Sequence, residues 1–188
     1  SFKREKYDKR SHRFLEKLCI DTAHEIAHTT KDGYAYWETI KDQHTGFTWT
    51  LPLRAISDLA TQLPPFLTDI QNRCGMSIRI LKTDGHLCYK NATIQSYLAR
   101  HGISHETNIP YTSQQNGRAE TSICKIRNKA RALLITAKLD VDYWPFAIQE
   151  ASRIGNLLPS TANPNNCSPY EMATGEKPHA SQLLLFGS

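Results

Sequence analysis

The sequence predicts a single α/β domain, in which helices pack on a sheet of about five strands. Three segments rich in aromatic and β-branched residues come first, as strands would. Beyond residue 57, segments with helical apolar spacing alternate with two further strand-like runs. Strands that form a meander and then alternate with helices give a sheet covered by helices. At 188 residues, the chain has the length of one domain with its own core.

The first three strands are predicted over residues 18–23, 34–40 and 47–53. The first is a short apolar run that places the carboxylate of Asp21 in mid-strand. Turn-like residues 41–46 separate the second strand from the third. We therefore expect these three strands to form an antiparallel meander.

The middle of the chain is predicted to contain a helix and a fourth strand. Apolar residues recur at helical spacing from 57 to 72, but Pro64 and Pro65 interrupt the pattern. Because proline lacks a backbone donor and clashes with the preceding turn, two helical pieces or a kink are expected. The strand over 78–83 delivers Asp84 at its carboxyl end.

The second half of the chain is predicted to be mainly helical. A short helix over 91–100 precedes a fifth strand over 102–107. Residues 108–117 are polar and contain glycine, which predicts a loop, and a long helix is expected to begin near Arg118. A last helix is predicted over 142–157 from its apolar spacing.

Three parts are expected along the chain. Residues 1–13 are strongly basic and form either a solvated linker or an arm that contacts nucleic acid; both interpretations stay open. Residues 14–158 form the core, and 159–188, rich in proline, asparagine and serine, extend it. Because the first residue is not methionine, the chain is expected to be a piece of a longer protein.

Composition narrows the class of partner. The chain has 23 basic and 18 acidic residues, a net charge of +5, which suits a polyanion but is shared by many proteins that bind none. The five cysteines form no C-x-x-C pair, so neither a zinc site nor a disulfide framework is predicted. No apolar run approaches the roughly 18 residues of a membrane span, so no membrane partner is expected.

Three carboxylates, Asp21, Asp84 and Glu120, are the candidate reaction centre. Thirty-five residues lie between the second and the third. Acidic ligands without a His or Cys cluster suit hard cations such as Mg²⁺, and paired Mg²⁺ ions serve phosphoryl transfer. Two of the three follow from strands and the third from a helix start, so they can converge at one edge of the sheet. The trio predicts cleavage or joining of nucleic acid.

The long helix adds candidate phosphate-binding residues. On a helical wheel, Arg127 and Arg131 share a stripe with Glu120, next to the apolar face. The planar guanidinium suits phosphate because it donates two hydrogen bonds at once. Lys125 and Lys129 point elsewhere and are interpreted as solvated surface lysines.

These motifs resemble the catalytic core of retroviral-type integrases, specifically those of copia-type LTR retrotransposons. The resemblance spans nearly the whole chain and rests on the following stretches: the Asp21 strand, Phe47-Thr-Trp-Thr-Leu-Pro-Leu53, Lys82-Thr-Asp84-Gly, Gly102-Ile-Ser-His, Pro110-Tyr-Thr-Ser-Gln-Gln-Asn-Gly-Arg-Ala-Glu120, Ser168-Pro-Tyr-Glu, Gly175-Glu-Lys-Pro178 and Leu185-Phe-Gly. The stretch that ends at Glu120, with its 35-residue spacing, is the most specific of them.

The resemblance implies an RNase H-like fold and a D,D(35)E site that binds two Mg²⁺ ions, with Mn²⁺ as a substitute. It implies that the protein processes the 3′ ends of element DNA and joins them to target DNA. Asp21, Asp84 and Glu120 carry over as the catalytic metal ligands. The loop beside the site carries over as DNA-binding, through Tyr111, Gln114, Gln115, Asn116 and Gly117.

Some neighbours of the carboxylates depart from the family pattern. Asn-Gly usually follows the second aspartate, whereas Asp84 is followed by Gly85-His86; Gly-Pro usually follows the first, whereas Asp21 is followed by Thr-Ala. A catalytically degenerate or domesticated core that acts as a DNA-binding or assembly module is therefore the alternative. A ribonuclease H, which shares the fold, is a third hypothesis. That class usually has a fourth carboxylate in the site and lacks the Gln-Gln-Asn-Gly loop, so this sequence disfavours it.

The resemblance also implies the surroundings in which the protein works. Its partners are expected to be element-end DNA, target DNA and further copies of the chain in a homo-oligomer. Its location is expected to be the nucleus, with a cytoplasmic stage in virus-like particles.

Overall fold

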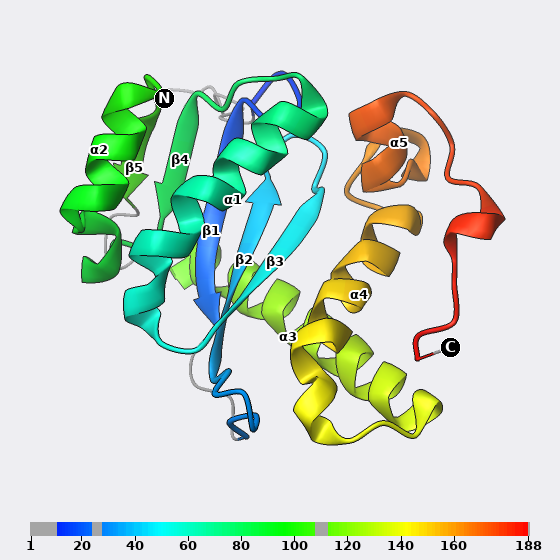
Figure 1. Ribbon diagram of the computed structural model, residues 1–188. Helices are drawn as coiled ribbons and strands as arrows, with labels where there is room; N and C mark the ends of the chain where they lie inside the picture. Colours follow the sequence, from blue (N-terminus) through cyan, green and yellow to red (C-terminus); the bar gives the residue numbers. More distant parts are fainter. Residues whose placement is uncertain (1–10, 24–27, 108–112, 188) are drawn as a thin grey trace.

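The computed structural model describes residues 11–23, 28–107 and 113–187, with the side chains of 113–121 outside the description. A five-stranded sheet forms the centre, with α1 (Leu59–Cys74) and α2 (Ala92–Arg100) on one face. On the other face lie α3 (Ser113–Ala137) and α4 (Trp144–Leu157), as Figure 1 shows. The predicted mixed sheet flanked by helices is confirmed.

The strand order explains how distant segments meet. Strands β1 (Lys17–Ala23), β2 (Tyr36–Asp42) and β3 (Thr48–Leu53) form the predicted antiparallel meander. Strand β4 (Ile80–Thr83) pairs in parallel with β1, and β5 (Ser104–Thr107) pairs in parallel with β4, so the order is β3-β2-β1-β4-β5. Strand β1 thus joins the meander to the parallel half of the sheet.

Helix α1 runs without a break through Pro64 and Pro65, so of the two predicted outcomes the division into two helical pieces is wrong, and the kink stays a prediction. Both prolines lie in its second turn, and each removes only one backbone hydrogen bond. The helix persists because its apolar face is fully covered by the sheet: Leu59, Leu63, Leu67 and Ile70 are all buried. Burial of each such side chain contributes about 1.5–3 kcal/mol, which outweighs the lost hydrogen bonds.

We expect Leu63→Ala to lower the free energy of unfolding by about 3 kcal/mol, because it leaves a cavity under the centre of α1. Leu184→Ala, at a residue that is 72% exposed, is the matched control and is expected to change it by less than about 0.5 kcal/mol. Urea unfolding measures both. Equal effects of the two substitutions would contradict this description of the core.

Helix α3 begins earlier than predicted. It starts at Ser113 rather than near Arg118, so Gln114, Gln115, Asn116 and Gly117 lie in its first turns and not in a loop. A glycine inside a helix costs only about 1 kcal/mol. The helix is 25 residues long, and its buried residues further along supply more than that. The local loop signal is therefore overridden by the rest of the helix.

The remaining elements complete the domain. Helix α2 begins at the predicted cap, where Asn91 Oδ1 accepts a hydrogen bond of 2.8 Å from the Thr93 amide. Helix α5 (Pro169–Thr174) packs near α4, and Arg153 of α4 donates to the backbone oxygen of Gln182 at 2.6 Å. Short 3-10 turns are η1 (Ile56–Asp58), η2 (Leu87–Lys90), η3 (Val141–Tyr143), η4 (Pro164–Asn166) and η5 (Ala180–Gln182).

Two apolar cores lie on opposite faces of the sheet. One joins the sheet to α1 and α2 and includes Ile20, Ile40 and Leu81. The other joins Ala23 and Trp37 to α3 and α4. Within the residues that the structure describes, no helix has the length and apolar character to cross a membrane.

Candidate active site

Asp21 lies within β1, and Asp84 directly follows the last residue of β4, the strand that pairs in parallel with β1. In the β1–β4 ladder, Lys17 is opposite Ile80 and Cys19 is opposite Lys82, an offset of 63 residues. The ladder ends at this pair; continued for two more residues, the same offset would bring Asp21 level with Asp84, just beyond the end of β4. Because neighbouring parallel strands lie about 4.8 Å apart and alternate their side chains in step, this register would bring the two carboxylates to the same face of the sheet.

The turn after β4 supports Asp84. Its Oδ1 accepts a hydrogen bond of 3.0 Å from the backbone amide of His86, and its carboxylate is exposed. Gly85 sits between them with φ of +85°, a left-handed conformation that glycine adopts without strain. The departure Gly85-His86 from the family pattern thus builds a tight turn that fixes the Asp84 carboxylate.

Glu120 belongs to the helix that covers the face carrying the two aspartates. Ala23 follows Asp21 by two residues, so it lies on the same face of β1, and it packs in one core with Ile126 of α3. Glu120 precedes Ile126 by six residues, about 9 Å along the helix axis. The Glu120 side chain lies outside the described residues, so its approach to the aspartates stays a prediction. Among the described side chains, no group of three or more His, Cys, Asp or Glu gathers at a metal site.

A fourth carboxylate, Glu38, lies directly behind this pair. It stands on β2 opposite Thr22, is fully buried, and faces the α1 side of the sheet with Ile40. Its oxygens accept hydrogen bonds from the Thr22 hydroxyl at 3.0 and 3.1 Å and from the Tyr89 hydroxyl at 2.9 Å. Because both oxygens are engaged and covered, Glu38 acts in support of the site and is not placed to be an additional metal ligand.

Burial raises the pKa of Glu38 to about 8, and the hydroxyls of Tyr89 and Thr22 oppose that rise. The negative charges of Asp84 and Asp21 push the pKa in the same direction as burial. The carboxyl of Glu38 is therefore largely protonated at neutral pH. The negative charges of the two nearby aspartates favour this protonated form.

The Glu38 hydrogen bonds connect the two segments that carry the aspartates. Thr22 directly follows Asp21 on β1, and Tyr89, in η2, follows Asp84 by five residues. The two hydroxyls also lie 3.2 Å apart. We conclude that this buried cluster fixes the carboxyl ends of β1 and β4 relative to each other. Sequence reasoning missed Glu38, although a lone acid inside the aromatic segment Tyr-Trp-Glu-Thr-Ile was a usable signal.

A second polar network supports β4 from the other side. The Thr83 hydroxyl lies 3.0 Å from His105 Nε2, and His105 Nδ1 lies 3.0 Å from the Gln95 amide nitrogen. That amide also donates to the backbone oxygen of Tyr89 at 2.8 Å. Partial burial lowers the pKa of His105, so the neutral ring is favoured. His105 is therefore a packing residue here.

The predicted DNA-binding residues are only partly described. Arg127 and Arg131 lie on α3 and are both exposed. Tyr111 lies outside the described residues. Gln114, Gln115, Asn116 and Gly117 are placed on the first turns of α3, but their side chains are outside the description. Contacts of all these residues with DNA stay predictions.

Proteins of similar sequence are retrovirus-related Pol polyproteins of plant transposons. No family model matches the chain. The chain is 31% identical over 156 residues, 83% of its length, to the retrovirus-related Pol polyprotein from transposon RE2 of Arabidopsis thaliana. It is 28% identical over 155 residues to the corresponding polyprotein from transposon TNT 1-94 of Nicotiana tabacum. The chain spans 10% and 12% of the length of these two relatives.

Solved structures support the fold. The catalytic core domain of BIV integrase matches with a TM-score of 0.64 at 16% identity, covering 86% of this chain and 95% of that one. The catalytic core domain of HTLV-2 integrase in complex with magnesium matches with a TM-score of 0.67 at 15% identity, covering 87% and 99%. The expected RNase H-like fold is confirmed. The chain is therefore homologous, over most of its length, to a segment of copia-type, retrovirus-related Pol polyproteins from plant transposons, and it has the fold of the integrase catalytic core.

Proposed function

We propose that this chain is a polynucleotidyl transferase that processes the 3′ ends of retrotransposon DNA and joins them to target DNA. The observation that carries the proposal is the parallel pairing of β1 with β4, which carries Asp21 and Asp84 toward the same end of the sheet, where the charges of both act on Glu38. Similarity to retrovirus-related Pol polyproteins and the fold shared with integrase catalytic cores support it, as does the net charge of +5.

The donor set fits a hard divalent cation. Asp21 and Asp84 offer carboxylate oxygens, the ligands that Mg²⁺ and Mn²⁺ prefer, and Glu120 completes the set. A pair of such ions supplies charge stabilisation for the attacking and leaving oxygens of an in-line displacement. The structural neighbour from HTLV-2 is described in complex with magnesium, which supports the same proposal here. The Glu38 cluster positions the two aspartates, and Arg127 and Arg131 hold the DNA phosphates.

We expect Mg²⁺ to stabilise the fold, because two neighbouring carboxylates repel each other without a cation. At ten times its dissociation constant, a bound ion adds about 1.4 kcal/mol, which raises Tm by about 3–6 °C in a chain of this size. Thermal unfolding with and without MgCl2 measures this shift. Asp84→Asn should abolish the shift, whereas Glu176→Gln, at an exposed carboxylate in the C-terminal segment, should keep it. An unchanged shift in Asp84→Asn would remove the aspartate pair as the metal site.

The test of the activity is a strand-transfer assay on oligonucleotides that carry the element ends, in Mg²⁺ and in Mn²⁺. A disintegration substrate is included because it asks only for the chemistry of the core. Joined or resolved products in either assay support the transferase. If neither forms in either metal while DNA is still bound, the protein is the inert DNA-binding or assembly module.

The second candidate, that inert module, is favoured by one observation. The turn Gly85-His86 takes up one oxygen of Asp84 with a backbone hydrogen bond. An oxygen that accepts one amide can still bind a metal ion, so the aspartate pair keeps the transferase as the better-supported function.

A further inference from the structure

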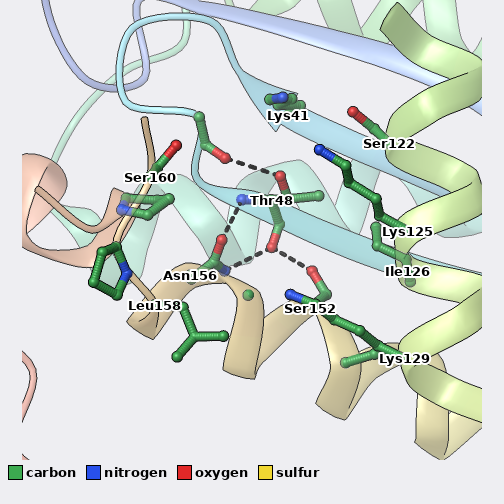
Figure 2. Close-up of a pocket in the computed structure, with 15 residues that line it drawn as sticks. Lys41, Thr48, Ser122, Lys125, Ile126, Lys129, Ser152, Asn156, Leu158 and Ser160 are labelled. Atoms are coloured by element: carbon green, nitrogen blue, oxygen red, sulfur yellow. Dashed lines mark hydrogen bonds between the residues drawn. The ribbon is translucent and has the colours of Figure 1, made fainter. Parts of the chain in front are cut away.

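A polar pocket lies beside α3, outside the Asp21–Asp84 pair. It has a volume of about 290 Å³ and lies between α3, α4 and the turn that joins β2 to β3. Three lysines line it: Lys41 at the end of β2, and Lys125 and Lys129 on α3. Figure 2 shows Lys125 and Lys129 reaching from α3 toward the polar groups at the pocket centre. Three ammonium groups therefore gather around one small volume.

No carboxylate neutralises these lysines within the described part of the chain. The ion pairs among the described side chains involve Lys17, Lys31, Arg73, Arg153 and His28, and none of the three pocket lysines. Burial of the ammonium lowers the pKa of Lys41, and the positive charge of Lys125 acts in the same direction. The like charges of Lys41 and Lys125 therefore oppose each other, and an anion between them would relieve that opposition.

The floor of the pocket is rigid. Asn156 of α4 accepts from the Thr48 amide at 2.8 Å and donates to the Thr48 oxygen at 2.8 Å. The Ser152 hydroxyl donates to the same oxygen at 2.6 Å, and Figure 2 shows these bonds converging on Thr48. These polar groups satisfy one another, so the lysines are the groups left to bind a ligand. Gly155 of α4 also lines the pocket, and a Cβ added there would be in ordinary van der Waals contact, 3.6 Å, with Lys129 Nζ.

The pocket and the reaction centre lie on different flanks of α3. Lys125 and Lys129 follow Glu120 by five and nine residues, so at about 100° per residue they lie about 140° and 180° around the helix from it. Arg127 and Arg131 lie on the Glu120 flank instead. Helix α3 thus carries two separate basic stripes, one with Arg127 and Arg131 and one with Lys125 and Lys129. The two lysines line the pocket.

We propose that Lys41, Lys125 and Lys129 form a second phosphate-binding site, which holds a backbone phosphate of a DNA strand away from the reaction centre. The choice of DNA as the source of the phosphate rests on the proposed function. Each lysine ammonium is a compact positive charge on a flexible stem, so three of them can bind one phosphate. Contacts with phosphates do not depend on the base sequence. The site therefore contributes affinity and orientation on DNA of any sequence.

The first test is the salt dependence of DNA binding, measured by fluorescence anisotropy with a duplex of arbitrary sequence. Each lost phosphate contact lowers the slope of log K against log salt by about 0.9. We expect Lys125→Gln/Lys129→Gln to lower the slope by about 0.9 or more. The matched control Arg100→Gln/Lys177→Gln removes two exposed charges elsewhere and should leave the slope nearly unchanged. An equal change of the slope in both double variants would mean that the pocket lysines act only as general surface charge, and this would overturn the proposal.

A second measurement uses the wild-type chain and needs no folded variant. An amine-reactive reagent labels lysines, and mass spectrometry reads the label at Lys41, Lys125 and Lys129 with and without DNA. Protection of all three by DNA, and not by tripolyphosphate at equal phosphate concentration, supports DNA as the ligand. Protection by tripolyphosphate alone assigns the site to a free polyphosphate, and labelling unchanged by either overturns the site. Glu120→Gln should keep the DNA protection, so loss of strand transfer and loss of this site are distinguishable.

Discussion

Replacement of Glu120 by glutamine is expected to reduce strand transfer by at least about a thousandfold. Glutamine keeps the size of the side chain but removes the charge that a divalent cation needs from its ligand. A thousandfold loss equals about 4 kcal/mol of transition-state stabilisation, the scale reached when one preorganised charge-stabilising group is removed from an active site. Rates of disintegration and strand transfer in Mg²⁺ measure the loss.

The control for Glu120→Gln is Glu176→Gln, which removes an exposed carboxylate after α5 and should leave the rate within about twofold. Far-UV circular dichroism and DNA affinity should be unchanged in Glu120→Gln, because α3 is held by Ile126 and Ala130 further along. Strand transfer at the wild-type rate in this variant would exclude Glu120 from the chemistry. The Asp21–Asp84 pair would then need another third ligand.

A pH-dependent stability is the second large effect, and Glu38 is its origin. The pKa of Glu38 is about 8 in the folded chain against an ordinary value of 4.5. Between these values the folded state holds a proton that the unfolded state has lost, so the free energy of unfolding falls as pH rises. Stability from this group is complete below about pH 4.5 and is lost by about pH 8, a total on the order of 4–5 kcal/mol.

Urea unfolding at intervals from pH 5 to pH 8, with divalent metals chelated, measures this dependence. Glu38→Gln should remove most of it, because the amide cannot ionise yet still accepts from Tyr89 and donates to Thr22. The free energy of unfolding of Glu38→Gln is therefore expected to rise relative to that of the wild type as pH rises. Glu38→Leu should instead lose about 1–3 kcal/mol at low pH, since it leaves two buried hydroxyls without their acceptor. A difference between wild type and Glu38→Gln that stays constant with pH would contradict the assignment.

The sequence predicts the sheet well because its strands have strong local signals. Aromatic and β-branched residues define β2 and β3, and the apolar run around Asp21 defines β1. The start of α3 at Ser113 is missed for the opposite reason. Its first residues favour a loop locally, and only the helix as a whole overrides them. The Pro64–Pro65 pair misleads in the same way, because tertiary burial of α1 is invisible in a local pattern.

Candidate residues can be found from the sequence when they lie in one recognisable motif. They cannot be found this way when their role depends on side chains from a second element of the fold. Spacing and flanking residues single out Asp21, Asp84 and Glu120 as candidates, and their role in the reaction stays a prediction. The role of Glu38 depends on which face of β2 it occupies and on the Tyr89 hydroxyl, 51 positions away. Lys125 and Lys129 are exposed, as predicted, but a helical wheel of α3 alone does not show that α4 and Lys41 enclose them in a pocket.

The β1–β4 pairing also sets when the reaction centre can exist. The two aspartates come from segments 63 residues apart, so neither half of the chain contains a site, and closing that interval costs about 4 kcal/mol of chain entropy. Long-range pairing of this kind forms late in folding. A chain still being synthesised, or one cut between β3 and β4, cannot bring its carboxylates together. The proposed reaction centre is therefore expected to form only after β1 and β4 have paired.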